Sequence, residues 1–200
     1  MTQANVTVTP EATPNPDSYK FVFNQEISQE TMSFNDPLQS SRSPLAHKIF
    51  GFPWVDSVFI GQNFVSINKQ DWVDWDMIAE PLANLLKEHI DDGLPVFADL
   101  SEKGEESQSN TSETPKHTIN PDDPEIINKI KNFLDQEIRP FVAMDGGDVN
   151  FHKFNDDSGV LEINMTGACN GCPSSTATLK MGIESRIQDI IPEVKEVISV

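Results

Sequence analysis

The feature that most constrains the fold is a stretch in the middle of the chain, Ser101 to Thr118, that contains no aliphatic or aromatic residue. Such a segment has no side chains with which to form a hydrophobic core. Its Ser, Glu, Gly and Pro content is typical of a solvated linker. The chain of 200 residues is therefore predicted to fold as two small α/β domains joined by an acidic disordered linker, in the α+β class.

The composition shifts on either side of this stretch set the domain boundaries. Residues 1–13 are predicted to be a flexible N-terminus, residues 14–98 a first domain, residues 99–120 the linker and residues 121–200 a second domain. Each domain is large enough for one small hydrophobic core.

The charge of the chain excludes several classes of partner. Its formal net charge is -18, from 14 Lys and Arg against 32 Asp and Glu. Nucleic acid and anionic membrane surfaces would repel such a protein, so we expect neither as a partner. The segment Met1 to Asp17 shows neither a secretory signal nor an Arg-bearing presequence, and we expect a cytoplasmic location.

In the first domain, residues 18–24 and the pair within residues 56–68 are predicted strands, the pair forming a hairpin around Gly61-Gln62-Asn63. A short helix is expected from Ser43 and Pro44 to Gly51. A longer helix follows Asp74, and we expect Pro81 to kink it or to begin a new helix, because proline lacks the amide proton.

The second domain is predicted to run helix, strand, strand, helix, strand. Its first helix begins after Asp123 and Pro124 and is expected to end at Arg139-Pro140. The strands within residues 148–155 and 160–165 form a hairpin, and a crossover helix then leads to a last strand parallel to the second.

The two cysteines of the chain, Cys169 and Cys172, lie between a predicted strand and the crossover helix. The helix dipole lowers the pKa of a thiol near its N-terminus and so favours the thiolate. Gly167 and Gly171 permit a tight bend that brings the two sulfurs together. The window therefore supplies a pair of soft, anionic ligands.

Three interpretations of this pair stay open on the residues alone: a metal or cluster site shared at an interface, dithiol redox chemistry, and an incidental pair. Zinc and cubane iron–sulfur sites need four ligands, and the chain has no second CxxC motif. His152, the one histidine of this domain, lacks ligand spacing. Two chains related by a two-fold axis would supply four thiolates.

Other conspicuous residues have simpler interpretations. The run Asp145-Gly146-Gly147-Asp148 is too short of oxygen ligands for a calcium loop, and we expect its carboxylates to bind backbone amides at the start of a strand. The tryptophans are expected to be core or hinge residues rather than a docking patch: Trp54, Trp72 and Trp75.

The motif "RPFVAMDGGDVNF" from Arg139 and the motif "GACNGCPSSTATLKMGIESRI" from Gly167 together resemble the C-terminal domain of the NifU/Nfu family of iron–sulfur cluster carriers. The segments "ATPNPDSYKFVFN" and "SPLAHKIFGFPWVDSVFIGQNFVSINK" resemble the N-terminal domain of Nfu-type proteins. The resemblance covers nearly the whole chain outside the first residues and the linker.

This resemblance implies a carrier or scaffold, not an enzyme, that holds a 4Fe-4S cluster between two chains through Cys169 and Cys172 of each. An upstream cluster scaffold and apo iron–sulfur acceptor proteins would then be its partners, with the N-terminal domain as a docking module. The alternative is a thiol–disulfide oxidoreductase with Cys169 as nucleophile. A structural zinc dimer is the third possibility.

Overall fold

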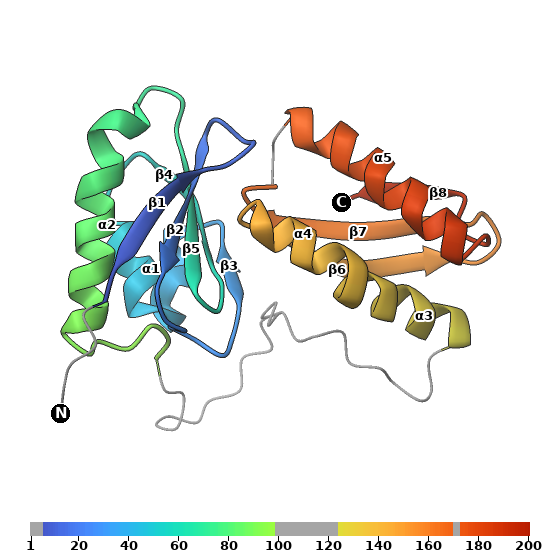
Figure 1. Cartoon of the computed structure of the whole chain (residues 1–200), viewed down its shortest axis with the longest axis horizontal. Helices are drawn as coiled ribbons and strands as arrows, with labels where there is room; N and C mark the ends of the chain where they lie inside the picture. The colour runs from blue at the N-terminus through green and yellow to red at the C-terminus, as the bar shows by residue number, and fades with distance from the viewer. Residues whose placement is uncertain (1–5, 99–123, 170–172) are drawn as a thin grey trace. The chain divides into compact units, whose positions relative to one another are not determined.

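The computed structural model of the chain describes residues 6–98, 124–169 and 173–200 (Figure 1). These residues form two compact units, each with a hydrophobic core of its own. We call the elements β1 to α2 the N-terminal unit and the elements α3 to β8 the C-terminal unit. Both combine helices with a sheet, which confirms the α+β class. The predicted linker, residues 99–120, lies outside the described residues.

The N-terminal unit is a five-stranded sheet with two helices, and its strands lie in the order β1-β2-β5-β4-β3 with antiparallel neighbours. Its elements are β1 (Val8–Ala12), β2 (Ser18–Phe23), β3 (Met32–Phe34), a 3-10 helix η1 (Pro37–Arg42), α1 (Pro44–Ile49), β4 (Val55–Ile60), β5 (Phe64–Lys69) and α2 (Trp75–Asp91). The predicted hairpin, β4 with β5, is confirmed.

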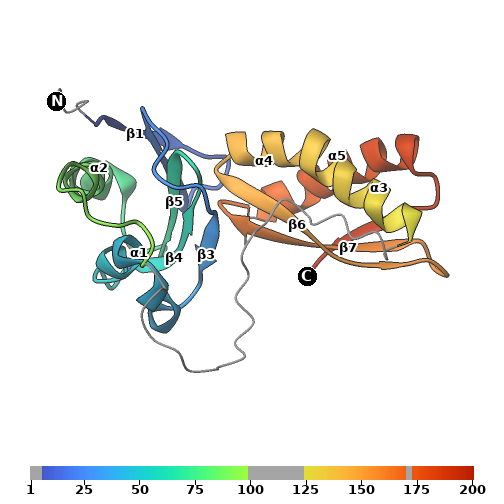
Figure 2. The ribbon, with the colours of Figure 1, turned by 90° about the horizontal axis from the view of Figure 1, so that it is seen from below.

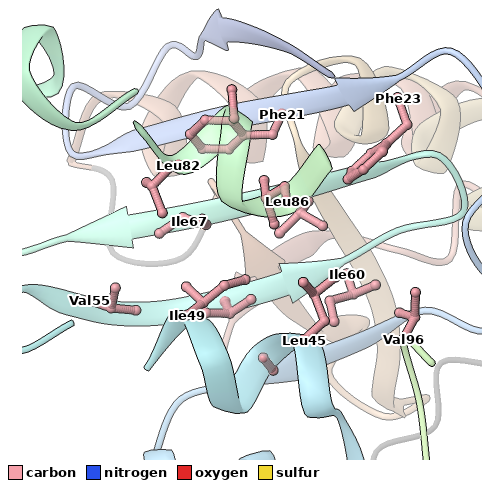
Figure 3. Packing of buried hydrophobic residues seen from close by; sticks show 14 of the residues in the cluster. Phe21, Phe23, Leu45, Ile49, Val55, Ile60, Ile67, Leu82, Leu86 and Val96 are labelled. Atoms are coloured by element: carbon pink, nitrogen blue, oxygen red, sulfur yellow. The ribbon is translucent and has the colours of Figure 1, made fainter. Parts of the chain in front are cut away.

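The core of this unit lies between the sheet and its two helices. Figure 3 shows Leu82 and Leu86 of α2 with Phe21 and Ile67 of the sheet, and none of these side chains is more than 2% exposed. Figure 2 shows α1 and α2 on the same side of the sheet. Burial of this apolar surface is the main stabilising contribution to the unit.

Local rules explain where these helices begin. Ser43 is the N-cap of α1, as predicted, because its Oγ accepts a hydrogen bond from the amide of Ala46 at 3.0 Å. Asp74 has the N-cap position of α2, but its side chain makes no capping hydrogen bond.

Two predictions for this unit are corrected by the structure. Strand β1 occupies part of the expected flexible terminus, and Pro10 is tolerated within it because β1 is an edge strand. Helix α2 also continues through Pro81 without a new start. Pro81 and Met77, one turn earlier, are exposed, so water can bind the carbonyl group that lacks its usual amide partner.

The C-terminal unit has the predicted element order of helix, strand, strand, helix and strand. Its sheet has the order β6-β7-β8, with β6 antiparallel and β8 parallel to β7, as predicted. The elements are α3 (Glu125–Phe133), a π-helical segment η2 (Leu134–Ile138), α4 (Arg139–Met144), β6 (Gly147–Asn155), β7 (Val160–Gly167), α5 (Pro173–Ile190) and β8 (Glu196–Ser199). Figure 2 shows α3, α4 and α5 on one side of the sheet.

The prediction that the first helix ends at Arg139-Pro140 is wrong, because α3, η2 and α4 follow one another without a break. In η2 the helix widens, and the amide of Arg139 donates to the carbonyl oxygen of Leu134, five residues earlier. Pro140 is then the second residue of α4, where a missing amide proton costs little. The predicted cap, Asp123, lies outside the described residues.

Candidate functional site

Cys169 lies directly after β7, which ends at Gly167, and α5 begins at Pro173. The predicted position of the cysteine window between a strand and a helix is therefore confirmed for its two flanks. Cys169 is 4% exposed and packs in the core of the C-terminal unit. Cys172 lies outside the described residues, and its role as a ligand stays a prediction.

The first strand of the sheet makes room for the Cys169 side chain. A Cβ atom placed on Gly147 would lie 2.6 Å from Sγ of Cys169 and 2.8 Å from the carbonyl oxygen of Thr166. Both distances are shorter than real carbon contacts allow, so only glycine fits at this position while the sulfur remains there. The second glycine of the Asp-Gly-Gly-Asp motif is thus explained by the sulfur that lies against it.

The backbone around this contact also requires glycine. Gly146 has φ of 81° and Gly167 has φ of 69°, in the left-handed region that side chains disfavour. The carbonyl oxygen of Gly146 accepts a hydrogen bond from the amide of Ala168 at 3.1 Å, which ties the start of β6 to the segment that carries Cys169. The cysteine is therefore held at a defined place on the end of the sheet.

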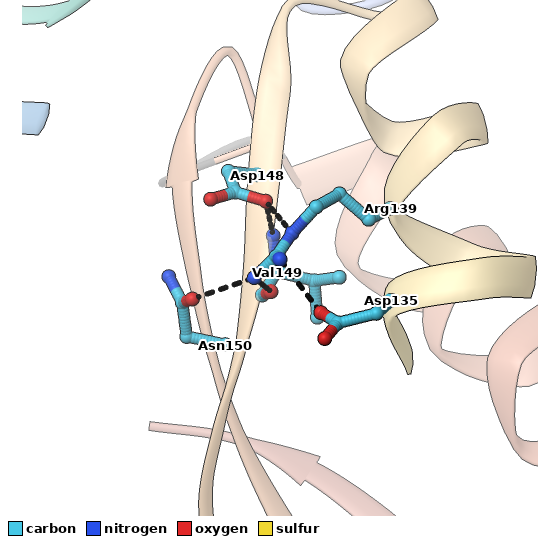
Figure 4. Close-up of polar contacts among 5 residues, drawn as sticks. All are labelled: Asp135, Arg139, Asp148, Val149 and Asn150. Carbon is cyan, nitrogen blue, oxygen red and sulfur yellow. Dashed lines mark hydrogen bonds and ion pairs between the residues drawn. The ribbon is translucent and has the colours of Figure 1, made fainter. Parts of the chain in front are cut away.

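Arg139 fixes the helix against this same end of β6 (Figure 4). Its Nε donates to Oδ1 of Asp148 at 2.8 Å, and its Nη1 lies 2.6 Å from Oδ1 of Asp135 one helical turn earlier. Its Nη2 donates to the carbonyl oxygen of Val149 at 3.2 Å and to Oδ1 of Asn150 at 3.1 Å. A planar guanidinium can satisfy several such acceptors at once, which a lysine ammonium cannot do in this geometry.

Asp148 links Arg139 to strand β6. Its side chain is 7% exposed, and Oδ1 also accepts a hydrogen bond from the amide of Val149 at 2.8 Å. The expectation that this aspartate binds a backbone amide is confirmed. The role of Arg139 was missed from the sequence, although its spacing of four residues from Asp135 is the pattern of a helical ion pair.

The histidines do not assemble a second site in the described ranges. His152 is exposed on β6, and its Nε2 lies 3.8 Å from Oε2 of Glu162. In the N-terminal unit, Nδ1 of His47 lies 3.0 Å from Oγ of Ser40, and Nε2 of His89 lies 3.1 Å from the carbonyl oxygen of Pro95. Within residues 6–98, 124–169 and 173–200, no three His, Cys, Asp or Glu side chains group as metal ligands would.

The three tryptophans have different environments. Trp75 is 7% exposed and its Nε1 donates to the carbonyl oxygen of Pro16 at 3.0 Å, while Trp54 stacks on Phe52 with ring centroids 5.2 Å apart. These two are structural, as predicted. Trp72 is 66% exposed, so it is the tryptophan that a partner could contact.

Comparisons with known proteins match both units. A model described as "Scaffold protein Nfu/NifU N terminal" matches residues 8–93, and a "NifU-like domain" model matches residues 130–198. The chain is 35% identical over 187 residues to the human protein named "NFU1 iron-sulfur cluster scaffold homolog, mitochondrial", which covers 92% of this chain and 68% of that protein.

Two further relatives are similar over nearly the whole chain. "NifU-like protein 5, mitochondrial" of Arabidopsis thaliana is 35% identical over 188 residues, covering 94% of this chain and 65% of its own length. A NifU-like protein of Schizosaccharomyces pombe is 34% identical over 193 residues, covering 95% of this chain and 71% of its own. The chain thus spans roughly two thirds of the length of these relatives.

The predicted cytoplasmic location is wrong in light of these comparisons, because the human and Arabidopsis relatives are named mitochondrial. The prediction used the composition of the first residues as its evidence. Among the helices that the structure describes, none has the length and apolar character to cross a bilayer.

Proposed function

Because this chain belongs to the Nfu family of NifU-like iron–sulfur cluster scaffold proteins, we propose that it holds a 4Fe-4S cluster between two copies and passes it to apo-proteins. Cys169 and Cys172 of each copy would be the ligands. Its role is then that of a carrier and not of an enzyme. The names of the relatives favour a mitochondrial location for this activity.

The observation that carries this proposal is the place of Cys169 on Gly147. The contact puts one cysteine at the end of the sheet, four residues before α5 begins at Pro173. The backbone on both sides is fixed by Gly146 and by the Arg139 ion pairs. Such a site supplies a sulfur ligand between the end of β7 and the start of α5.

Two thiolate ligands from each copy suit the transfer of the cluster to an acceptor protein. A 4Fe-4S cluster takes four thiolates, so two copies complete the set without a ligand from any other residue. An acceptor with four cysteines can then replace these thiolates one at a time, each Fe–S bond to this chain being exchanged for one to the acceptor. No electron is transferred in the exchange, because a thiolate leaves for every thiolate that binds.

The burial of Cys169 has a consequence for the protein without its cluster. Sγ lies against Gly147 in the core of the C-terminal unit. This position shields the sulfur from oxidants before the cluster, which is the cargo, is loaded.

The N-terminal unit is proposed to dock partners, namely the apo-protein acceptors and an upstream scaffold that supplies the cluster. The sequence has no cysteine in this unit, so it cannot bind the cluster by thiolate. Trp72 is the exposed aromatic residue through which docking can be tested. We expect Trp72→Ala to slow transfer to an acceptor while leaving cluster loading unchanged.

Anaerobic reconstitution with ferrous iron and sulfide tests the central proposal. We expect about four irons and four sulfides per two chains in the full-length protein, and neither in the Cys169→Ala nor the Cys172→Ala variant. Mass measurement of the eluted species gives the number of chains. A colourless monomer that reduces disulfides, and loses this turnover in Cys169→Ser, would instead support the oxidoreductase alternative.

Transfer is measured separately by mixing the loaded protein with an apo-acceptor that carries four cysteines. We expect iron and sulfide to move together to the acceptor, with the loaded dimer separating into monomers. A colourless zinc-bound dimer that releases nothing to the acceptor would support the structural zinc interpretation.

A further inference from the structure

Large apolar side chains are exposed on the two helices beside the cysteine window. Phe141 and Met144 of α4 are 49% and 73% exposed, and Met181 of α5 is 71% exposed. The guanidinium carbon of Arg186, also on α5, lies 4.7 Å from the centre of the Phe141 ring and so joins the two helices. We call Phe141, Met144, Gly182 and Arg186 the α4–α5 face.

No contact within the described part of the chain explains why residue 182 of this face is a glycine. It lies inside α5, where glycine is less favourable than alanine because it loses more backbone entropy on folding. A Cβ atom placed there would have no heavy atom within 4 Å in the part of the chain that the structure describes. The missing side chain therefore leaves space for close approach by another molecule.

The α4–α5 face borders the candidate site. Met144 ends α4, and three residues later Gly147 lies against Sγ of Cys169. Helix α5 begins at Pro173, the residue that follows Cys172. In Figure 1 the end of α4 and the start of α5 lie at the same end of the sheet, where β6 begins and β7 ends.

We propose that a second copy of this chain packs on the α4–α5 face with the same face of its own, and so brings the two cysteine windows together. The inference rests on the proposed function, since two thiolates per chain leave a 4Fe-4S site incomplete. The missing ligands have to arrive beside Cys169, and this is the exposed apolar surface of the described C-terminal unit that adjoins it.

Charge favours a second copy at this place over other parts of the surface. With a net charge of -18, two copies repel each other across most orientations. Among the residues that define the α4–α5 face, only Arg186 is charged, and its charge is positive. A two-fold axis brings the same patch of both copies together, and an apolar patch is complementary to itself.

The test compares matched variants of the full-length protein after reconstitution with ferrous iron and sulfide. Met144→Glu places a carboxylate on the face, and Met77→Glu makes the same change at a residue of α2 that is 77% exposed. We expect Met144→Glu to raise the protein concentration needed for half-dimerisation by roughly tenfold or more and to lower iron per chain. Met77→Glu is expected to behave as the wild type in both measurements.

Gly182→Ala separates the interface from folding. We expect the substitution to raise the melting temperature of the cluster-free protein, because alanine favours the helix, and yet to weaken the loaded dimer. A variant that merely fails to fold would not change these two readouts in opposite directions.

Three outcomes would contradict the proposal. If the wild type forms the four-iron dimer and both face variants do so equally well, the second copy binds elsewhere while the proposed function stands. If the variants dimerise normally but transfer their cluster more slowly, the face binds the acceptor instead. If the wild type binds no cluster, the proposed function fails and this inference fails with it.

Discussion

The two units of this chain use their buried polar groups differently. In the N-terminal unit, the buried Ser43 binds backbone groups of its own unit: its Oγ donates to the carbonyl oxygen of Val96 at 2.6 Å and accepts from the amide of Ala46. In the C-terminal unit, the buried Asp148 and its partner Arg139 lie beside the strand residue that contacts Cys169. The first arrangement stabilises a core, whereas the second also positions a sulfur. Stability and function should therefore separate between the units.

The largest expected effect is a loss of stability that is confined to the N-terminal unit. Phe21 is fully buried, so Phe21→Ala removes its packing and leaves a cavity, at a cost of about 3–5 kcal/mol. All three tryptophans belong to this unit, so their fluorescence follows its unfolding specifically. We expect a much lower fluorescence melting temperature with unchanged iron per chain after reconstitution. Loss of iron binding would show that the units are not independent.

The next effect concerns the ion pairs of Arg139. Arg139→Met leaves the buried carboxylate of Asp148 without its positive partner, which we expect to cost the C-terminal unit about 3 kcal/mol. Circular dichroism should show the loss, while tryptophan fluorescence should not. Arg139→Lys keeps the positive charge but lacks the planar guanidinium, so we expect its stability to lie between that of Arg139→Met and that of the wild type. Equal stability of Arg139→Lys and the wild type would show that charge alone matters.

A smaller effect sharpens the comparison within the C-terminal unit. Gly147→Ala forces Cys169 or the backbone of Thr166 to move, for about 1–3 kcal/mol. Gly159→Ala is the matched control at the opposite end of β7, where φ is 73° and the new Cβ would lie 2.6 Å from the carbonyl oxygen of Glu193. We expect both variants to melt earlier and only Gly147→Ala to bind less iron. Equal iron binding would mean that Gly147 does not position the sulfur.

The smallest expected effect is a pH dependence confined to the N-terminal unit. Burial lowers the pKa of His89 below its ordinary value of 6.5, outweighing the hydrogen bond to Pro95, which raises it. As the pH falls, His89 of the unfolded chain therefore takes up a proton at a higher pH than His89 of the folded chain. The contribution of neutral His89 to stability is complete above about pH 6.5 and is lost as the pH falls toward the lowered pKa. We expect His89→Gln to flatten the fluorescence melting temperature across this interval; an unchanged slope would assign it to carboxylates.

Much of the fold follows from local sequence signals. Alternating apolar residues predicted β4, β5, β6 and β7, and the Ser43-Pro44 start predicted α1. The errors came from proline, which was taken as a helix end at Pro140 and, in one of two expected outcomes, as a new helix start at Pro81. In both places the backbone compensates, through the π segment or through exposure to water. These compensations depend on the surrounding structure, and a proline alone does not reveal them.

The candidate site was predictable in position but not in its supports. The CxxC spacing and the following helix predicted where Cys169 lies. Nothing local shows that Gly147 contacts it, because the contact depends on the register that pairs Gly147 with Gly167 across two strands. The helical pair of Asp135 and Arg139 was visible, whereas its link to Asp148 needed the packed structure.

The π segment η2 sets how far α3 is rotated about the helix axis relative to α4. Each residue of an α-helix turns the chain by about 100°, so the extra residue in η2 rotates α3 relative to α4 by that amount. Ile130 of α3 can then face the core while Arg139 faces Asp148. Deleting Gln136 would restore a regular helix, yet one of these two orientations would be lost. The π segment thus lets one continuous helix direct Ile130 toward the core and Arg139 toward Asp148.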